Sequence, residues 1–308
     1  MQGMLREAKP SRLEDLIALN ALYRPGPMDL IPSFVARKHG TEVIEYPHPL
    51  VEKVLAETYG IMVYQEQVMQ TAQVLGGYSL GGADLLRRAM GKKKPEEMAQ
   101  HRLLFREGAG KQGIPPEKAD EVFDLMEKFA GYGFNKSHAA AYSLLAYHTA
   151  WIKVHYTAEF FCGNMTVEMD NTDKLKVLHE DALKMGLTFE PPDVNRGGYR
   201  FEPVTDKVIR YGLGAIKGSG QAAIEAIIAA RNGQGPGPQG HVQGPFKSLW
   251  DFCTRVDRAK LNKRTLEALI KAGAFDSIER NRAALMAATD AAFEFANAQW
   301  ANAHQGGL

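Results

Sequence analysis

The chain has 308 residues, of which 45% are hydrophobic and 24% are charged, and its formal net charge at pH 7 is +1. These proportions are typical of a soluble globular protein with room for two domains. The balanced charge excludes a uniformly basic protein, so any surface for nucleic acid must be a local patch. Cys162 and Cys253 have no metal or redox spacing, and no signal peptide or apolar run of about 18 residues is present. A cytoplasmic location, without membrane contact, is expected.

The first part of the chain reads as a succession of short helices separated by turns of proline and glycine. Residues 11–14 form a capping box for a first helix, and Arg24-Pro25-Gly26-Pro27 ends it, because proline fixes φ and glycine permits a tight turn. Apolar residues at helical spacing predict further helices near residues 50–56, 65–76, 79–90, 95–108 and 116–130. The abrupt start and end of the sequence suggest that it is taken from a longer protein.

Residues 84–94, DLLRRAMGKKK, form a basic stretch in a chain whose charge is otherwise balanced. Arg87 and Arg88 fall near the end of one predicted helix, off its apolar face, and three lysines beginning with Lys92 follow. Adjacent arginines can bind phosphate oxygens bidentately, and lysines act as point charges. The basic stretch is therefore a candidate anion site; the alternative is an ordinary turn whose lysines are solvated.

A second candidate lies at residues 133–143, GFNKSHAAAYS, where a glycine turn leads into a long apolar helix. Ser137 is the expected N-cap, and the unpaired amides and positive dipole end of such a helix start attract anions. Lys136 and His138 flank the cap, and Tyr142 lies four residues after His138 on the same helix face. This combination suits a phosphate-bearing nucleotide. The alternative is a plain helix start whose aromatic residues lie in the core.

The apolar helix that begins there is expected to run to about Phe161. Most of its rings are expected in the core, since it carries Tyr142, Trp151 and Phe160 among other apolar residues. His148 and His155 are seven residues apart, which is no metal spacing, so both are interpreted as structural.

The sequence pattern changes near Glu190 from helical segments to short β-like runs. We place a boundary there between a domain of residues 1–190 and a smaller one of residues 191–308. Residues 199–211 contain two short β-like runs joined by Thr205-Asp206, which predict a hairpin. Residues 232–245 are rich in glycine and proline and predict a flexible surface loop. Two helices after this loop complete a fold that is expected to be mainly α.

Between the hairpin and this loop, Lys217, Gly218, Ser219 and Gly220 lie directly before an Ala/Ile-rich helix. Glycines let the backbone approach an anion closely, and the helix start supplies N–H donors. The pattern is that of a helix-hairpin-helix, which holds a DNA backbone phosphate without reading sequence. A shorter echo appears at residues 269–274. The alternative is a glycine loop that only ends one element and starts the next.

Taken together, these segments resemble the C family of DNA polymerases, the alpha subunits of bacterial replicative DNA polymerase III. The segments that carry the resemblance cover nearly the whole chain, and they are ALYRPGP, YGIMVYQEQVMQ, GGADLLRRAMGKKKPEEM, FAGYGFNKSHAAAYS, MDNTDKL, YGLGAIKGSG and LEALIKAGAFD. The resemblance implies a multi-helix fingers domain followed by the helix-hairpin-helix part of the clamp-binding region. It also implies template-directed nucleotidyl transfer as the activity of the full protein.

The resemblance assigns roles to the two candidate sites and to the helix-hairpin-helix. Arg87, Arg88 and Lys92 would bind phosphate oxygens of the incoming deoxynucleotide. Further residues would line the nucleotide pocket against the palm domain: Lys136, Ser137, His138 and Tyr142. The backbone of primer–template DNA would be contacted by the helix-hairpin-helix residues Lys217, Gly218, Ser219 and Gly220.

The chain departs from the family in two respects: it lacks the catalytic aspartates, and its loop of residues 232–245 is longer than the family usually has, so that loop has no assigned role. The catalytic aspartates that hold Mg²⁺ lie in the palm, upstream of residue 1, so no catalytic residue and no metal ligand is expected here, and the chain alone should be inactive. Gln305 to Leu308 match only the first four residues of a sliding-clamp motif whose phenylalanine would come next. Clamp binding through Gln305 and Leu308, and contacts with other replicase subunits, are therefore expected only in the full protein; the alternative is that the four-residue match arises by chance.

Two other functions remain open from the sequence alone. The chain could be a non-enzymatic nucleic-acid-binding module built on the helix-hairpin-helix, which would bind DNA in a salt-dependent way but not nucleotides. It could also be a helical interaction scaffold whose basic residues are merely solvated, which would bind neither.

Overall fold

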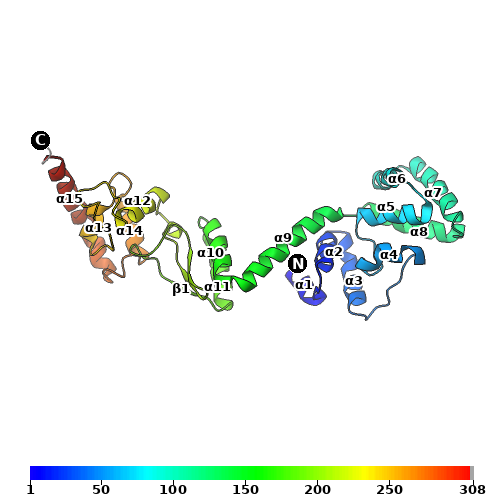
Figure 1. Cartoon of the computed structure of the whole chain (residues 1–308), viewed down its shortest axis with the longest axis horizontal. Helices are drawn as coiled ribbons and strands as arrows, with labels where there is room; N and C mark the ends of the chain where they lie inside the picture. The colour runs from blue at the N-terminus through cyan, green and yellow to red at the C-terminus, as the bar shows by residue number, and fades with distance from the viewer. Residues whose placement is uncertain (306–308) are drawn as a thin grey trace. The chain divides into compact units, whose positions relative to one another are not determined.

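The structure is a computed structural model that describes residues 1–305, and its fold is mainly α, as predicted (Figure 1). Backbone contacts divide the chain into two compact units, one of residues 1–148 and one that begins at Thr149. The predicted boundary at Glu190 lies later in the chain than this division. Residues 149–190 belong to the second unit because they pack with its β-strands.

The first unit is built from helices joined by short turns. They are α1 (Gln2–Ala8), α2 (Leu13–Leu22), α3 (Ile31–Lys38), α4 (Glu52–Leu55), α5 (Gln65–Gly76), α6 (Leu80–Lys92), α7 (Pro95–Gly110), α8 (Pro116–Ala130) and the greater part of α9 (Lys136–His155). The apolar stripes predicted from helical spacing are buried, among them Leu86 and Met90 of α6 and Phe123 and Met126 of α8. These side chains belong to one continuous core.

Helices α5 and α7 approach each other closely where Gly76 faces Gly108. A Cβ atom placed on Gly108 would overlap the carbonyl oxygen of Gly76. The ring of Phe105, one turn earlier on α7, fills the space beside Gly76. Small residues at this crossing therefore let the two backbones pack directly against each other.

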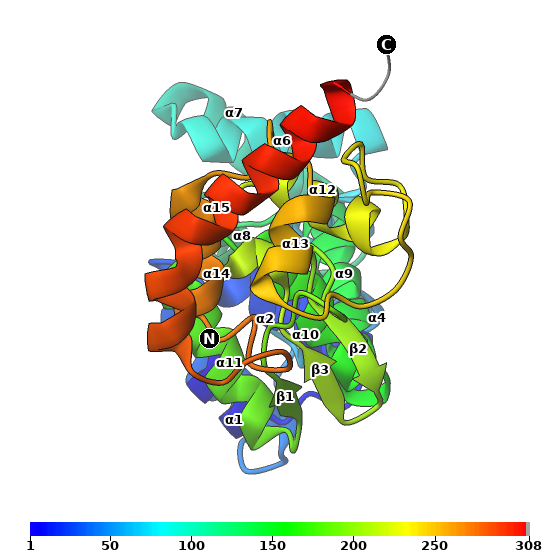
Figure 2. The ribbon, with the colours of Figure 1, turned by 90° about the vertical axis from the view of Figure 1, so that its left-hand side faces the viewer.

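The second unit combines helices with a small sheet (Figure 2). Its elements are α10 (Thr157–Val167), α11 (Thr172–Lys184), β1 (Thr188–Glu190), β2 (Glu202–Thr205), β3 (Val208–Arg210), α12 (Gln221–Arg231), α13 (Leu249–Arg255), α14 (Lys263–Lys271) and α15 (Arg282–Gln305). Strands β2 and β3 form the predicted antiparallel hairpin. Strand β1 pairs with β3 in parallel, which local sequence did not predict.

Two cores lie within the second unit. One places α10 and α11 against the sheet, with Phe161 and Ile209 fully buried. The other is formed by α12 to α15, where α15 lies across α13 and α14 (Figure 2). Within it, Ile224, Phe252 and Leu269 are fully buried.

The prediction for the long apolar helix was wrong in two respects. The helix ends at His155, and α10 begins at Thr157 after a break at Tyr156, where φ is −134° and ψ is 58°. Its rings are not core residues: Tyr142 is 58% and Trp151 is 45% exposed. Helix α9 is apolar around most of its circumference, so composition could not indicate which face is covered, and small residues such as Ala139 and Ser143 are the buried ones.

Residues 232–245 are held by the buried side chain of Arg255. This guanidinium is only 1% exposed, and its Nη2 atom donates to the carbonyl oxygens of Ala230 (3.0 Å), Val242 (2.7 Å) and Gly244 (2.8 Å). The ring of Phe246 lies 4.6 Å from the guanidinium carbon. The segment predicted as a flexible surface loop is thus hydrogen-bonded, through the carbonyl oxygens of Val242 and Gly244, to one buried arginine.

Candidate functional site

The start of α9 is capped by Asn135, and the prediction of Ser137 as N-cap was wrong. The Oδ1 atom of Asn135 accepts from the N–H of His138 at 2.8 Å and from Oγ of Ser137 at 2.6 Å. Both residue types are good caps, so the turn geometry decides between them. Because the helix already begins at Lys136, Ser137 lies inside it and exposes its side chain.

At this helix start, the backbone N–H and the ammonium group of Lys136 already have carboxylate partners. The carboxylate of Glu66 accepts from the N–H of Lys136 at 3.1 Å and from Nδ2 of Asn135 at 3.1 Å. The Nζ atom of Lys136 lies 2.6 Å from Oε1 of Glu57 and 5.5 Å from the ring centroid of Tyr64. The amide of Lys136, expected to be free for an anion, therefore already has an internal acidic partner.

A row of planar side chains leads from the first helices to the exposed face of α9. The guanidinium carbon of Arg24 lies 4.5 Å from the ring centroid of Phe134, and Nη2 of Arg24 donates to the carbonyl oxygen of Tyr132 at 2.6 Å. Ring centroids are 5.5 Å apart between Phe134 and His138 and 4.9 Å apart between His138 and Tyr142. His138 and Tyr142 thus share a face, as predicted, and both are exposed.

The basic stretch is arranged around one carboxylate. Asp84 lies 2.8 Å from Nη2 of Arg87 and 2.8 Å from Nε of Arg88. The hydrogen bond from Arg87, together with the charges of both arginines, lowers the pKa of Asp84. Lys92 is the last residue of α6, and Lys93 ends the helix in the left-handed conformation with φ of 53°.

The structure brings the two candidate sites of the first unit together at the start of α5. Nη1 of Arg87 lies 3.4 Å from Oε1 of Gln65, and the N–H of Gln65 donates to the carbonyl oxygen of Phe134 at 3.0 Å. The neighbouring Glu66 holds the turn before α9, as described above. A Cβ atom on Gly131 would lie 3.9 Å from Cε of Lys93. The basic stretch and the turn before α9 therefore flank the same helix start, which local sequence did not indicate.

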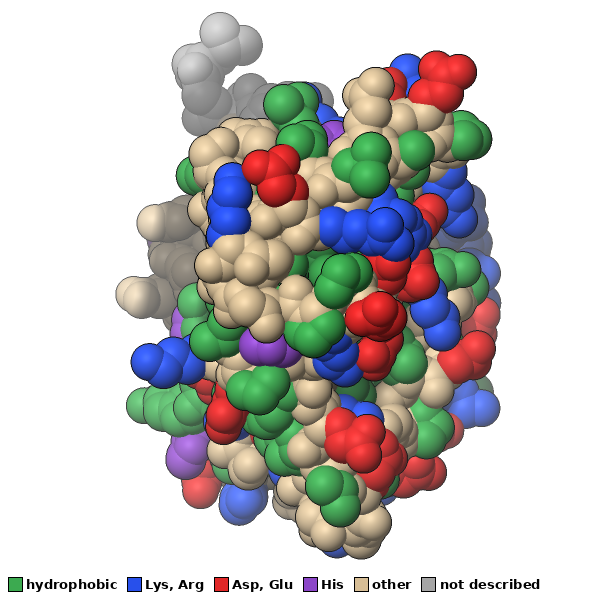
Figure 3. All heavy atoms as spheres, turned by 90° about the vertical axis from the view of Figure 1, so that its right-hand side faces the viewer, with side chains coloured by type: hydrophobic (Ala, Val, Ile, Leu, Met, Phe, Trp, Pro, Cys, Tyr) green, Lys and Arg blue, Asp and Glu red, His purple; other side chains and the backbone are tan. Residues whose placement is uncertain are grey.

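The surface around these groups is not uniformly basic. On α7 and α8, Arg102 pairs with Asp124, and Arg106 pairs with Asp120. Figure 3, which looks at one end of the molecule, shows Lys and Arg side chains next to Asp and Glu side chains. Within the basic stretch, Arg87 and Arg88 share Asp84 and Lys94 pairs with Glu97, so part of its positive charge is already balanced.

In the second unit, the turn of residues 217–220, predicted as part of a helix-hairpin-helix, has a backbone conformation that needs glycine. Gly218 has φ of +95°, a conformation that L-residues rarely adopt, and Gly220 is the N-cap of α12. Oγ of Ser219 donates to the carbonyl oxygens of Leu213 (2.9 Å) and Ile216 (2.7 Å), which closes the turn. An open cavity of about 750 Å³ adjoins it, and among its lining residues are Lys217, Gly218, Arg264 and Lys271.

The proposed echo at residues 269–274 is not a second hairpin. Ala272 ends α14, Gly273 turns the chain with φ of +82°, and the next helix, α15, begins only at Arg282. The glycine at this position serves as a helix terminus.

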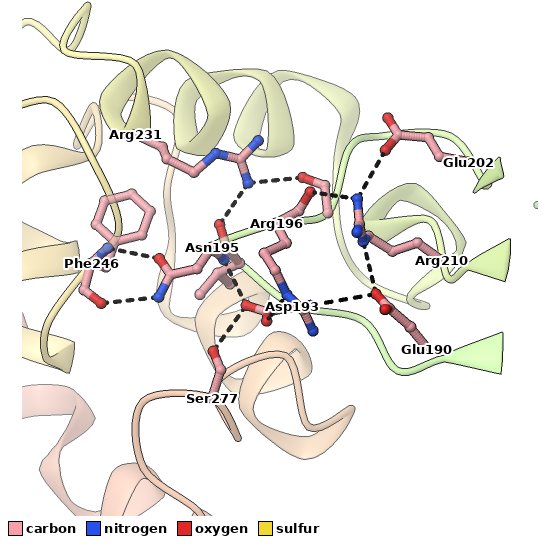
Figure 4. A network of polar contacts seen from close by, with 11 residues as sticks. Glu190, Asp193, Asn195, Arg196, Glu202, Arg210, Arg231, Phe246 and Ser277 are labelled. Atoms are coloured by element: carbon pink, nitrogen blue, oxygen red, sulfur yellow. Dashed lines mark hydrogen bonds and ion pairs between the residues drawn. The ribbon is translucent and has the colours of Figure 1, made fainter. Parts of the chain in front are cut away.

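A polar network fixes residues 193–197, which lie between β1 and β2 (Figure 4). Asp193 accepts from Oγ of Ser277 at 3.0 Å and pairs with Nε of Arg196 at 3.1 Å. Nη1 of Arg231 donates to the carbonyl oxygens of Val194 and Gly197, both at 3.0 Å. These bonds tie the segment between β1 and β2 to Ser277 and to the C-terminal end of α12.

Other expected features lie partly outside the described residues. Gln305 is the last residue of α15, but its side chain and all of Leu308 are outside the described part of the chain. Among residues 1–305, no group of three or more His, Cys, Asp or Glu side chains could hold a metal ion. No helix in the same part of the chain is both long and apolar enough to cross a membrane.

The two units correspond to known sequence families. Residues 1–113 match the family described as bacterial DNA polymerase III alpha subunit finger domain, and residues 186–285 match the helix-hairpin-helix motif. The chain is thus a polymerase fingers domain followed by a helix-hairpin-helix region.

The chain is similar over its whole length to curated proteins named DNA polymerase III subunit alpha. It is 61% identical over 308 residues to that of Neisseria meningitidis serogroup B, and the match covers 100% of this chain and 26% of the relative. It is 59% identical over 286 residues to that of Xylella fastidiosa Temecula1, covering 93% of this chain and 23% of the relative. For Escherichia coli K12 the identity is 54% over 293 residues, covering 93% and 24%. The chain belongs to the family of bacterial DNA polymerase III alpha subunits and spans about a quarter of the length of these relatives.

Proposed function

We propose that this chain is the part of a replicative DNA-directed DNA polymerase that handles the incoming deoxynucleotide and the duplex product. Family membership supports the polymerase activity, which would reside in the longer polypeptide. The observation that supports the nucleotide role most directly is the meeting of the basic stretch with the turn before α9 at the start of α5. We further propose that the protein works in the cytoplasm.

The side chains of this region are suited to a triphosphate next to a base. Arg87, Arg88 and Lys92 would neutralise phosphate oxygens, which is electrostatic and positioning work in phosphoryl transfer. His138 and Tyr142 offer exposed planar faces, and Ser137 offers a hydroxyl beside them. Lys136, already paired with Glu57, would contact a nucleotide only after exchanging that partner.

Magnesium would supply charge neutralisation and activation of the attacking oxygen in nucleotidyl transfer. The described residues contain no acidic cluster that fits such an ion, so its carboxylate ligands would lie elsewhere in the longer polypeptide. The chain alone is accordingly expected to have no polymerase activity.

For the second unit we propose that the hairpin of residues 217–220 binds a phosphate of primer–template DNA. The N–H groups at the start of α12 and the side chain of Lys217 would be its donors. Binding of a sliding clamp near Gln305 and Leu308, and of other replicase subunits, is proposed only for the longer polypeptide.

The DNA proposal is tested by titrating labelled primer–template DNA into the chain at several salt concentrations. Lys217→Ala is expected to weaken binding about 5- to 10-fold and to reduce the salt slope by about 0.9, because one phosphate contact is lost. Gly218→Pro is expected to abolish hairpin binding, since proline cannot adopt a positive φ. The matched control Lys207→Ala removes an exposed lysine in the turn between β2 and β3, outside residues 217–220, and should change nothing. Equal affinity of Lys217→Ala and Lys207→Ala would refute the hairpin assignment.

The nucleotide proposal is tested in the polymerase polypeptide that contains this chain. Arg88→Ala is expected to raise the KM for deoxynucleotides about 10- to 100-fold, because charge-assisted hydrogen bonds to phosphate are lost. Arg106→Ala, whose partner is Asp120 on α8, is the control and should leave KM unchanged. DNA binding without any effect of Arg88→Ala would instead favour a non-enzymatic helix-hairpin-helix module.

A further inference from the structure

Glu66 is the acidic side chain that joins α5 to the turn before α9. Its Oε1 accepts from Nδ2 of Asn135, and its Oε2 accepts from the N–H of Lys136, both at 3.1 Å. Both oxygens of one carboxylate are thus used by two adjacent residues far away in sequence. A carboxylate in this bidentate arrangement fixes orientation as well as distance.

The bond from Nδ2 determines which way the amide of Asn135 faces. With its nitrogen directed to Glu66, the Oδ1 atom of Asn135 faces the helix and accepts from Ser137 and His138. The reversed amide would place two oxygens against each other and remove the cap of α9. Glu66 therefore determines the cap, and the cap determines where Ser137 and His138 point.

The start of α5, which carries Glu66, is itself fixed by buried hydrogen bonds. The side chain of Gln67 is 2% exposed, and its Oε1 accepts from the N–H groups of Val63 (2.8 Å) and Tyr64 (3.0 Å). Its Nε2 donates to Oγ1 of the buried Thr58 at 2.8 Å. On the other side, Gln65 contacts Arg87 of the basic stretch. The start of α5 therefore contacts both Arg87 of the basic stretch and, through Glu66, the cap of α9.

We propose that Glu66 is a positioning residue of the nucleotide site, which sets the orientation of the α9 start through Asn135. This inference rests on the proposed nucleotide-binding function. A negative charge beside a triphosphate site opposes nucleotide binding, so electrostatics alone predicts that removing it lowers the KM for deoxynucleotides. Positioning predicts the opposite sign.

The test uses Glu66→Gln in the polymerase polypeptide that contains this chain. We expect the KM for deoxynucleotides to rise about 10-fold, with kcat changed less than about twofold and the Kd for primer–template DNA unchanged. The control Glu97→Gln removes a carboxylate that pairs with Lys94 in the basic stretch without touching the turn, and it should not raise KM.

A paired exchange separates positioning from loss of stability. Asn135→Asp alone sets two carboxylates against each other and is expected to raise KM as well. In the double variant Glu66→Gln with Asn135→Asp, the new amide can donate to the new carboxylate, which still caps α9, and net charge is unchanged. KM is expected to return to within about twofold of the parent. This comparison stands even where Glu66→Gln alone fails to fold.

Three results would overturn the inference. A lower KM for Glu66→Gln would identify the carboxylate as an electrostatic competitor. Failure of the double variant to recover would exclude orientation through Asn135. An unchanged KM for Glu66→Gln, while Arg88→Ala raises KM, would leave the nucleotide site standing and remove only the role of Glu66. If Arg88→Ala also leaves the KM for deoxynucleotides unchanged, the proposed nucleotide function fails.

Discussion

Replacing Arg255 by methionine is expected to lower the free energy of unfolding by about 3–5 kcal/mol. The methionine keeps much of the side-chain volume but removes every donor. The carbonyl oxygens of Ala230, Val242 and Gly244 would then lose the donor that they share. Asp251, which lies 3.3 Å from Nη1 of Arg255, would also lose its cation. The buried carbonyl oxygen of Ala230 and the part-buried ones of Val242 and Gly244 carry a large part of this cost.

Urea unfolding followed by tryptophan fluorescence measures the effect of Arg255→Met, since Trp250 lies on the same helix, α13. The control is Arg258→Met, an exposed arginine just after this helix, for which a change within about 0.5 kcal/mol is expected. A loss below about 1 kcal/mol for Arg255→Met would mean that water can replace the guanidinium. In that case residues 232–245 would not depend on it.

Replacing Gly108 by alanine is expected to destabilise the first unit by about 3 kcal/mol. Within a helix this substitution normally stabilises by about 0.5–1 kcal/mol, because glycine loses more backbone freedom on folding. Here the added methyl group would overlap the backbone oxygen of Gly76, which cannot rotate away as a side chain would. Helices α5 and α7 would have to separate along their contact.

The control for Gly108→Ala is Gly91→Ala in α6, where a Cβ atom would meet nothing within 4 Å. This variant should raise the midpoint of thermal unfolding, whereas Gly108→Ala should lower it. The two identical substitutions thus have opposite expected signs. Equal shifts of both variants would contradict direct packing of α5 on α7.

Local pattern predicted much of the fold and less of the candidate site. The stripe containing Leu86 on α6 and the hairpin of β2 and β3 follow from spacing and turn residues alone. Strand β1 was missed because three residues carry too little pattern, and its pairing depends on β3 in space. The exposed rings of α9 show the same limit, since periodicity cannot identify the covered face of a helix that is apolar all round.

For the site, sequence identified the basic groups but not their acidic partners. Arg87 and Lys136 stand out by charge and by their place at helix ends. Glu57 and Glu66 carry no local signal, because each meets Lys136 only through the tertiary fold. The segment YGIMVYQEQVMQ carried the family resemblance but was given no site role. Within it, Gln65 and Glu66 connect the two candidate sites, and Gln67 fixes the helix start that carries them.

The shared carboxylate of Asp84 has a thermodynamic consequence for the arginine pair. Arg87 and Arg88 each lie one helical turn from it, and each uses only some of its N–H groups in that contact. At the phosphate site proposed above, these contacts would partly restrict the rotamers of both side chains before an anion binds. That part of the conformational entropy of two flexible side chains would be lost when α6 folds and not when an anion binds, so a smaller entropic penalty would oppose binding at this site than at a pair of freely rotating arginines.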